Sequence, residues 1–201
     1  WKIRVIKVTD VPVTYGGKAL HNIMNCLPAV LSTYFWRNIE IEDIKLALQT
    51  FIPSSTQTPG RLNLFQFKHF QFLVDFAHNP AGLELLCDFV SKLDGEPKVG
   101  IISGTGDRRD EDIIECGKIA GRMFDHIIIR QEKHLRGRTE ENIIELILGG
   151  INASGKKITY EIIPKEIEAI KHSISIAEDG TFIVALSDVV TNAIEIVQEY
   201  L

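Results

Sequence analysis

The chain has 201 residues, a length that allows one ordinary domain and part of a second. Apolar residues make up 45% of it, so it can bury a hydrophobic core. The net charge of −5 argues against binding to nucleic acid or to an anionic membrane surface. No apolar run approaches the roughly 20 residues that cross a bilayer, and no signal-peptide pattern is present.

The three cysteines, Cys26, Cys87 and Cys116, are far apart in the sequence and form no CxxC pair. A zinc site built on thiolates is therefore not expected. An odd number of widely spaced cysteines fits buried thiols in a reducing cytoplasm, which is the location we expect. Each cysteine lies among apolar residues in a helical pattern, so no catalytic thiolate is predicted.

Residues 1–60 show no regular alternation of strands and helices. The patterns of residues 3–8 and 11–14 predict two strands. A long helix is predicted over residues 18–35, and a second, amphipathic helix over residues 41–51. These few elements would leave apolar faces uncovered, which indicates a severed part of a larger domain and could promote self-association into a homo-oligomer.

Residues 53–61, PSSTQTPGR, form the best linker in the chain because they are rich in Pro, Ser and Thr. We therefore predict one domain over residues 1–60 and a second over residues 61–201. The second begins with a hairpin of residues 62–67 and 70–75. Further strands are predicted at 99–103, 126–130, 158–163 and 181–186, and helices at 83–93, 110–124, 139–148, 164–177 and 188–200. This alternation predicts an α/β fold with a mostly parallel, Rossmann-like sheet whose strands are apolar on both faces.

The stretch VDFAHNPAG, residues 74–82, places Asp75 and His78 directly after a predicted strand. Asn79 is a good N-cap and Pro80 suits a first helical turn, so a helix is predicted to begin here. A strand end beside a helix N-terminus favours an anion such as phosphate, with Asp75 free to accept hydrogen bonds from hydroxyl groups. The alternative is that Asp75 caps a turn and His78 packs against it.

The stretch ISGTGDRRDED, residues 102–112, follows the next predicted strand. Gly104 and Gly106 form a tight turn that would let the backbone approach a ligand closely, and Asp107 begins a charged run that leads into a helix. The stretch is neither a P-loop nor a complete GxGxxG fingerprint. Two interpretations of this stretch remain: a loop that binds a nucleotide, and an ordinary strand-to-helix turn with a salt-bridged face.

Two further segments carry polar side chains that could bind a ligand. Arg136 and Arg138, in RQEKHLRGR, could bind a carboxylate or phosphate bidentately at a strand end, or lie in a solvated charged loop. Asn22 and Asn25 lie three residues apart on one face of the long N-terminal helix. Their amides could bind the edge of a base, although such pairs are commonly solvated.

In this order, GGKALHNIMNCLPAVL, PGRLNLF, VDFAHNPAG, GTGDRRDED and an RGR before a helix resemble the Mur ligase superfamily. The resemblance is closest to the carboxy-terminal ligase module of the cyanophycin synthetase family and covers nearly the whole chain. It implies that residues 1–60 are the C-terminal remnant of a central ATPase domain and that residues 61–201 are the C-terminal domain. It also implies an ATP-dependent acid–amino-acid ligase that activates a carboxylate as an acyl phosphate for attack by an amine.

The resemblance assigns a nucleotide site by matching positions. The matched residues are Asn22, Asn25, Arg61, Asp75, His78 and Asn79. The two helix asparagines would lie against the adenine, and Asp75 would hold the ribose hydroxyls. Arg61 matches a linker arginine that reaches the ATP phosphates, and His78 and Asn79 fall where the loop after the strand approaches the nucleotide. Arg61 and His78 are the predicted catalytic residues.

The resemblance also implies a site for the incoming amino acid, formed by Arg136, Arg138 and Asp107. Arg136 matches the arginine of an Asp-Asn-Pro-Arg motif in diaminopimelate-adding relatives. Here LysHisLeu, residues 133–135, replaces Asp-Asn-Pro, which argues for a different amino acid. In the cyanophycin synthetase family that amino acid is arginine, added to the aspartate side chains of a poly-aspartate primer. The carboxylates available for its guanidinium are Asp107, Asp110, Glu111 and Glu132.

The sequence contains no GxxxxGK[ST] loop, which family members carry in the central domain together with their Mg²⁺ ligands. The chain, which begins at Trp1, is therefore expected to belong to a larger parent that uses ATP and Mg²⁺. Alone it should bind ATP weakly and not catalyse ligation. Two alternatives stay open: a peptidoglycan-type or folylpolyglutamate synthetase-like ligase, and a stand-alone, non-catalytic module that binds a nucleotide or a carboxylate.

Overall fold

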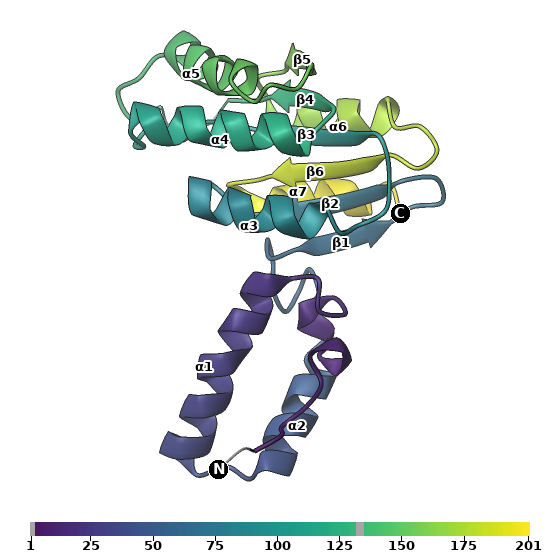
Figure 1. The fold of residues 1–201 in the computed structure, drawn as a ribbon. Helices are drawn as coiled ribbons and strands as arrows, with labels where there is room; N and C mark the ends of the chain where they lie inside the picture. Colours follow the sequence, from purple (N-terminus) through teal and green to yellow (C-terminus); the bar gives the residue numbers. More distant parts are fainter. Residues whose placement is uncertain (1–2, 132–134) are drawn as a thin grey trace. The chain divides into compact units, whose positions relative to one another are not determined.

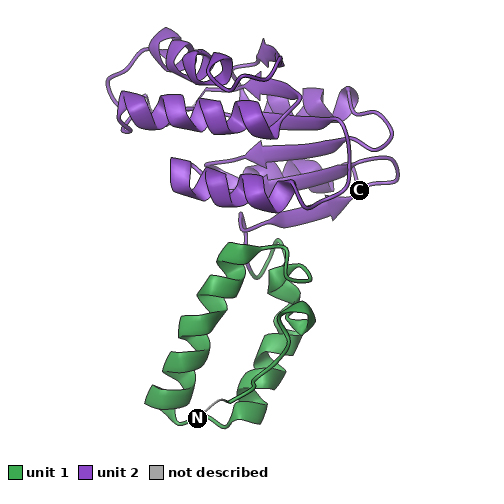
Figure 2. Ribbon diagram, in the orientation of Figure 1, with its two compact units in different colours: residues 1–57 green, residues 58–201 purple. Residues whose placement is uncertain are grey.

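The computed structural model describes residues 3–131 and 135–201 of the chain. It separates into two compact units, Trp1–Gln57 and Thr58–Leu201 (Figure 2). The division lies inside the linker segment 53–61. It stays a prediction that the first unit is the remnant of a central ATPase domain and that the second is the C-terminal domain of a ligase.

The second unit is built on a six-stranded sheet with the order β1-β2-β6-β3-β4-β5 (Figure 1). The strands are β1 (Asn63–Gln66), β2 (Gln71–Asp75), β3 (Lys98–Ile102), β4 (His126–Ile129), β5 (Thr159–Ile162) and β6 (Phe182–Leu186). β1 pairs antiparallel with β2, and every other neighbouring pair is parallel. The predicted α/β fold, a mostly parallel sheet with an N-terminal hairpin, is therefore confirmed.

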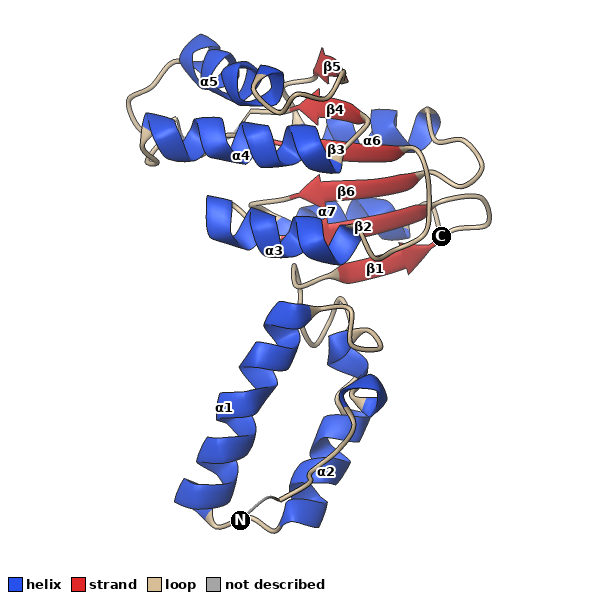
Figure 3. Ribbon diagram, in the orientation of Figure 1, coloured by secondary structure: helices blue, strands red, loops and turns tan. Residues whose placement is uncertain are grey.

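Helices cover both faces of this sheet (Figure 3). They are α3 (Pro80–Val90), α4 (Asp110–Met123), α5 (Glu140–Asn152), α6 (Glu166–Ser175) and α7 (Val190–Gln198). α3, α4 and α5 pack in one layer, and α6 and α7 pack together on the opposite face (Figure 1). Because of this sandwich, all five residues of the central strand β6 are buried.

The edge strand β5 departs from the expected pattern. All four of its residues are exposed, and Tyr160 and Ile162 retain 48% and 45% of their accessible surface. The expectation that the strands are apolar and covered on both faces is therefore wrong for β5. The reason is topological, since β5 pairs only with β4 and lies at the margin of the helical layers.

The first unit contains α1 (Leu20–Arg37) and α2 (Ile41–Thr50), close to the predicted helices. The two predicted strands over residues 3–8 and 11–14 are wrong: this segment contains the short 3₁₀ helices η1 (Val8–Asp10) and η2 (Pro12–Thr14). The Thr14 hydroxyl lies 2.7 Å from the Val8 carbonyl oxygen and 2.8 Å from that of Val11, which curls the chain into turns. A proline within the segment also removes a donor that a strand ladder would need.

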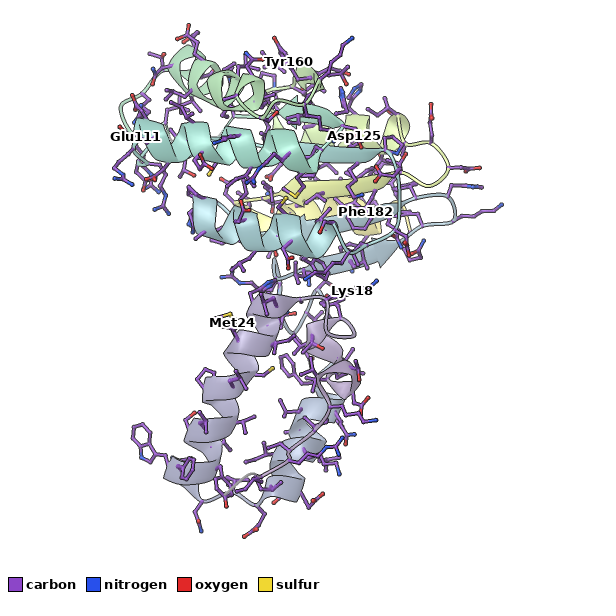
Figure 4. All side chains as sticks on the ribbon, in the orientation of Figure 1. Lys18, Met24, Glu111, Asp125, Tyr160 and Phe182 are labelled. Atoms are coloured by element: carbon purple, nitrogen blue, oxygen red, sulfur yellow. The ribbon has the colours of Figure 1, made fainter. Side chains whose placement is uncertain are left out.

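Apolar side chains line one side of α1 in this unit. Leu20, Met24, Leu27, Leu31 and Phe35 recur at helical spacing and are all exposed, from 45% for Leu20 to 75% for Phe35. Met24 points away from its helix in Figure 4. In the part of the chain that the structure describes, no helix is both long and apolar enough to cross a membrane.

Candidate functional site

A cavity of about 210 Å³ opens at the carboxyl ends of the parallel strands in the second unit. Its walls come from the loops that follow β2, β3, β4 and β6. β6 lies between β2 and β3, yet its loop leads to α7 on one face while theirs lead to α3 and α4 on the other (Figure 1). Loops that diverge in this way leave a crevice, which is the usual ligand site of open parallel sheets.

The charged side chains that line the cavity are Arg108, Arg130, Arg136, Asp107 and Asp188. Arg136 pairs with Asp107 and Arg130 with Asp188, whereas the buried Nε of Arg108 has no hydrogen-bond partner among the described residues. A buried hydroxyl adds to this surface: Ser187 is 3% exposed, and its Oγ has no hydrogen-bond partner among the described residues. Such a lining suits a ligand that brings a carboxylate or phosphate group.

Asp75 lies at the end of β2 and is 8% exposed. Its Oδ2 accepts a hydrogen bond from the Leu62 N–H at 2.9 Å, and its Oδ1 accepts one from the Ala77 N–H at 2.8 Å. Both oxygens thus hold the backbone in a turn, as expected if Asp75 caps a turn. Each carboxylate oxygen can accept a second hydrogen bond, so its role toward a ribose stays a prediction.

Arg61, Phe76 and His78 lie together beside this turn. The Arg61 guanidinium carbon is 5.6 Å from the centre of the Phe76 ring, a cation–π distance. The His78 ring meets the same phenyl ring edge to face, and its Nδ1 lies 2.9 Å from the Phe76 carbonyl oxygen. His78 thus packs on Phe76, and both line the cavity.

Asn79 caps α3 as the sequence predicted. Its side-chain oxygen accepts a hydrogen bond from the Gly82 N–H at 2.8 Å, and Pro80 is the first helical residue. This cap fixes the direction in which the chain leaves β2. The predicted approach of Asn79 to a nucleotide is not tested by this contact.

Arg138 lies in a different environment from the one expected of a substrate ligand. Its Nε donates to the Gly106 carbonyl at 3.1 Å and its Nη2 to the Arg108 carbonyl at 2.7 Å. Its Nη1 donates to Asn142 at 3.0 Å and pairs with Asp110 at 2.7 Å. The guanidinium is directed into the protein, where it fastens the loop after β3 to the start of α5.

Asp107 and Arg136, the other two residues predicted for the amino acid, form an ion pair and both line the cavity. Of the further candidate carboxylates, Asp110 pairs with Arg138, and Glu111 is exposed on α4. Glu132 lies outside the described residues, as do Lys133 and His134 of the segment that replaces Asp-Asn-Pro.

Sequence reasoning missed Arg130, Ser187 and Asp188. Arg130 follows the isoleucines of β4 and is 3% exposed, with its Nη2 donating to the Leu186 carbonyl at 2.8 Å and pairing with Asp188 at 2.7 Å. The available signal was position: Arg130 and Ser187 directly follow apolar strands and Asp188 comes one residue later, where side chains of an open sheet meet ligands.

Asn22 and Asn25 lie on α1 in the first unit. The Asn22 amide donates to the Val13 carbonyl at 2.7 Å and thereby ties α1 to η2. Asn25 is exposed. At least one of the two amides is therefore already used within its own unit.

The cysteines and metal-ligating residues offer no further chemistry. All three cysteines are free and partly buried, and burial raises the pKa of each, that of Cys116 to about 11. Within residues 3–131 and 135–201, no group of three His, Cys, Asp or Glu side chains could hold a metal ion.

Comparison with known proteins adds to this geometry. Residues 60–189 match the protein family described as Mur ligase, glutamate ligase domain. The chain is 41% identical over 195 residues to a cyanophycin synthetase of Crocosphaera subtropica, and 40% identical over 200 residues to one of Geminocystis herdmanii. These matches cover 97% and 100% of this chain but only 22% and 23% of those proteins, so the chain spans less than a quarter of their length.

The fold is similar to that of a solved structure of Mycobacterium tuberculosis folylpolyglutamate synthase complexed with ADP. The TM-score is 0.70 and the sequence identity 20%, with 90% of this chain and 40% of the other covered. At that identity the similarity concerns the fold alone.

Proposed function

This chain belongs to the Mur ligase family, and from that membership we propose that it is the part of an ATP-dependent ligase that receives the incoming amino acid. The observation that carries the proposal is the cavity at the carboxyl ends of β2, β3, β4 and β6. Its three guanidinium groups, and the Ser187 hydroxyl that has no partner among the described residues, suit the carboxylate of an amino acid. Arg136, paired with Asp107, would meet that carboxylate.

The nucleotide would bind on the side of the cavity formed by the end of β2. Arg61 is an exposed cation held over Phe76, where it would stabilise negative charge on the transferred phosphoryl group. His78 lines the cavity beside it and would contact the same phosphates. Asp75 would accept hydrogen bonds from the ribose with its remaining lone pairs, next to Asn79 at the start of α3. On α1 of the first unit, Asn22 and Asn25 are our candidates for binding an adenine base.

The reaction we propose has two steps. A carboxylate of the acceptor attacks the terminal phosphorus of ATP, and ADP leaves, which yields an acyl phosphate. The uncharged amine of the incoming amino acid then attacks the acyl carbon, inorganic phosphate leaves, and the amine gives up a proton as the amide forms. The cavity would contribute by holding the amine close to the acyl carbon.

For the substrates we propose arginine and the aspartate side chains of a poly-aspartate primer. Identities of 41% and 40% to two cyanophycin synthetases, over nearly all of this chain, support this choice. The replacement of Asp-Asn-Pro by LysHisLeu at residues 133–135 argues against diaminopimelate. Asp188 lines the cavity and joins Asp107 and Asp110 as a carboxylate that could meet a guanidinium group. Each of the three already forms an ion pair, Asp188 with Arg130.

We further propose that the 201 residues alone do not ligate. They contain no GxxxxGK[ST] loop, and ATP and Mg²⁺ would be bound mainly by other parts of the gene product. The expected location is the cytoplasm, where ATP is available.

The test is an assay of the full gene product with ATP, poly-aspartate primer and single amino acids. We expect release of ADP and a gain in primer mass with arginine, and neither with diaminopimelate or glutamate. The 201-residue chain, assayed in parallel, should release no ADP. Ligation of a muramyl peptide in place of poly-aspartate would overturn the substrate assignment, and a full gene product without amino-acid-dependent ADP release would overturn the ligase.

A further inference from the structure

Arg130 is a buried cation whose role the proposed reaction does not explain. It follows β4, carries a guanidinium group and is 3% exposed. A buried charge of this kind is costly unless partners surround it, and removing a partner is strongly destabilising. Its partners therefore indicate what the residue is for.

These partners come from three other elements of the fold. The main-chain N–H of Arg130 donates to the Ile102 carbonyl at the end of β3 at 2.8 Å. Its Nη2 donates to the Leu186 carbonyl at the end of β6 at 2.8 Å and pairs with Asp188 Oδ1 at 2.7 Å. Its Nε lies 3.5 Å from Glu166 Oε1 at the start of α6. The side chain thus ties β4 to β6 and α6 along the edge that carries the cavity.

The two shortest contacts of the Arg130 side chain, with Leu186 and Asp188, both hold the β6–α7 loop. Leu186 and Asp188 flank Ser187, whose buried Oγ lines the cavity without a partner among the described residues. The Ser187 N–H donates to the Asp75 carbonyl at 2.9 Å, which holds the loop from the β2 side. With Arg130 on the other side, the residues before and after Ser187 are both fixed.

We propose that Arg130 is a positioning residue, which holds the β6–α7 loop so that Ser187 and Asp188 face the incoming amino acid. This inference rests on the proposed function of the cavity. Arg130 lines the cavity wall, yet its Nη2 is already engaged by the loop, so it acts through Ser187 and Asp188. A residue of this kind affects the fit of one substrate and leaves the nucleotide side unchanged.

The test compares Arg130→Lys with the wild type in the full gene product. Lysine keeps the charge but is a single point donor, so it cannot hold both the carbonyl and the carboxylate in one geometry. We expect the KM for the amino acid to rise about tenfold or more, with kcat and the KM for ATP within about twofold of wild type. Arg122→Lys is the matched control, because Arg122 is partly exposed and pairs with Glu84 away from the cavity. It should leave all three constants unchanged.

A second readout does not depend on activity. In ¹⁵N spectra of the 201-residue chain, Arg130→Lys should shift the amide signals of Ser187 and Asp188, and Arg122→Lys should not. If Arg130→Lys fails to fold, Glu166→Gln replaces it in the test. This variant weakens the contact between Glu166 and the Arg130 guanidinium, and Glu166 does not line the cavity. The same KM should then rise about two- to fivefold.

An unchanged KM for the amino acid, with only a lower melting temperature, would overturn the positioning role and leave Arg130 as a support of the fold. Unshifted Ser187 and Asp188 signals would overturn it equally. If the wild-type gene product shows no amino-acid-dependent release of ADP, the proposed function fails instead, and the amide shifts alone then report whether Arg130 holds the loop.

Discussion

The Asp75 carboxylate accepts a hydrogen bond at 2.9 Å from the main-chain N–H of Leu62, which lies on the other side of the β1–β2 hairpin. Leu62 is 1% exposed and has a φ of 53°, a left-handed conformation that leucine rarely adopts. The second Asp75 oxygen accepts the Ala77 N–H. One carboxylate therefore fixes the turn that carries Arg61 against the loop that carries His78, and brings these two predicted residues to the same place.

We predict that Asp75→Ala destabilises the chain by about 2–4 kcal/mol, because it leaves two main-chain N–H groups without their acceptor. Asp75→Asn keeps one acceptor oxygen, so its loss should be smaller. Urea unfolding followed by circular dichroism measures both. An alanine variant as stable as wild type would contradict this role and show that water replaces the carboxylate as the acceptor of these N–H groups.

The contrast between Asn79 and Asp75 explains what could be predicted from the sequence. The Asn79 cap was predicted correctly because its partner is three residues away and the geometry is local. The partners of Asp75 include Leu62, 13 residues earlier in the chain, and that contact depends on the register of a hairpin. Alternation of apolar runs was enough for the sheet and its helices, since burial on both faces imposes it.

The same limit applies to the charged loops and to the first unit. Nothing local distinguishes Arg136, which lines the cavity, from Arg138, which fastens a loop through the carbonyls of Gly106 and Arg108. Arg130 opens the RQEKHLRGR stretch, but as the last residue of a predicted strand it was given no role. In the first unit, residues 3–8 have the composition of a strand, but the described residues of that unit contain no strand to pair with them. Tertiary context therefore decided against their propensity.

Arg138→Lys tests the loop-fastening role. The lysine ammonium cannot donate to the Gly106 and Arg108 carbonyls in the geometry that the planar guanidinium allows. We therefore expect the free energy of unfolding to fall by about 1.5–3 kcal/mol. Faster hydrogen exchange should follow for the amides of the loop after β3. Arg109→Lys is the matched control, because Arg109 is exposed and pairs only locally with Asp112. It should change stability by less than about 0.5 kcal/mol. Equal effects of the two variants would contradict this role.

Alanine substitutions at the two adjacent glycines of α5, Gly149 and Gly150, should change stability in opposite directions. A Cβ on Gly150 would lie 2.0 Å from the Ile114 carbonyl oxygen of α4, so the two helices meet backbone to backbone there. Gly150→Ala should therefore cost about 1–3 kcal/mol through overpacking. A Cβ on Gly149 meets nothing within 4 Å, so Gly149→Ala should stabilise the helix by about 0.5–1 kcal/mol. Thermal unfolding of both variants checks this, and a common sign would refute the close approach.

Cys116 should be unreactive in the folded chain. Burial raises the pKa of its thiol to about 11, compared with 9.0 for an ordinary cysteine. At pH 8 about 0.1% of the thiol is then ionised, roughly 100-fold less than for the unperturbed group. We expect alkylation by iodoacetamide to be slower by a similar factor than in urea, as measured by peptide mass spectrometry. Equal rates would mean that the α4 environment opens readily.

His126 should make the stability of the chain depend on pH. Burial lowers the pKa of its imidazole below 6.5, with Glu161 of β5 acting in the opposite direction and His172 of α6 adding to the decrease. The imidazole also contacts the Thr159 hydroxyl through Nδ1 at 2.8 Å. Between the lowered pKa and 6.5 the unfolded chain binds more protons than the folded one. The contribution of His126 is therefore fully present above pH 6.5 and is lost as the pH falls toward the lowered pKa.

His126→Gln removes the titrating group, so we expect it to flatten the decline in unfolding free energy as the pH falls below 6.5. Urea unfolding at a series of pH values measures the slope. Glu161→Gln should steepen the wild-type decline, because it removes the carboxylate that opposes the lowered pKa of His126. If the unfolding free energy of His126→Gln fell with pH as steeply as that of the wild type, groups other than His126 would cause the pH dependence. Any effect of Glu161→Gln would then not act through His126.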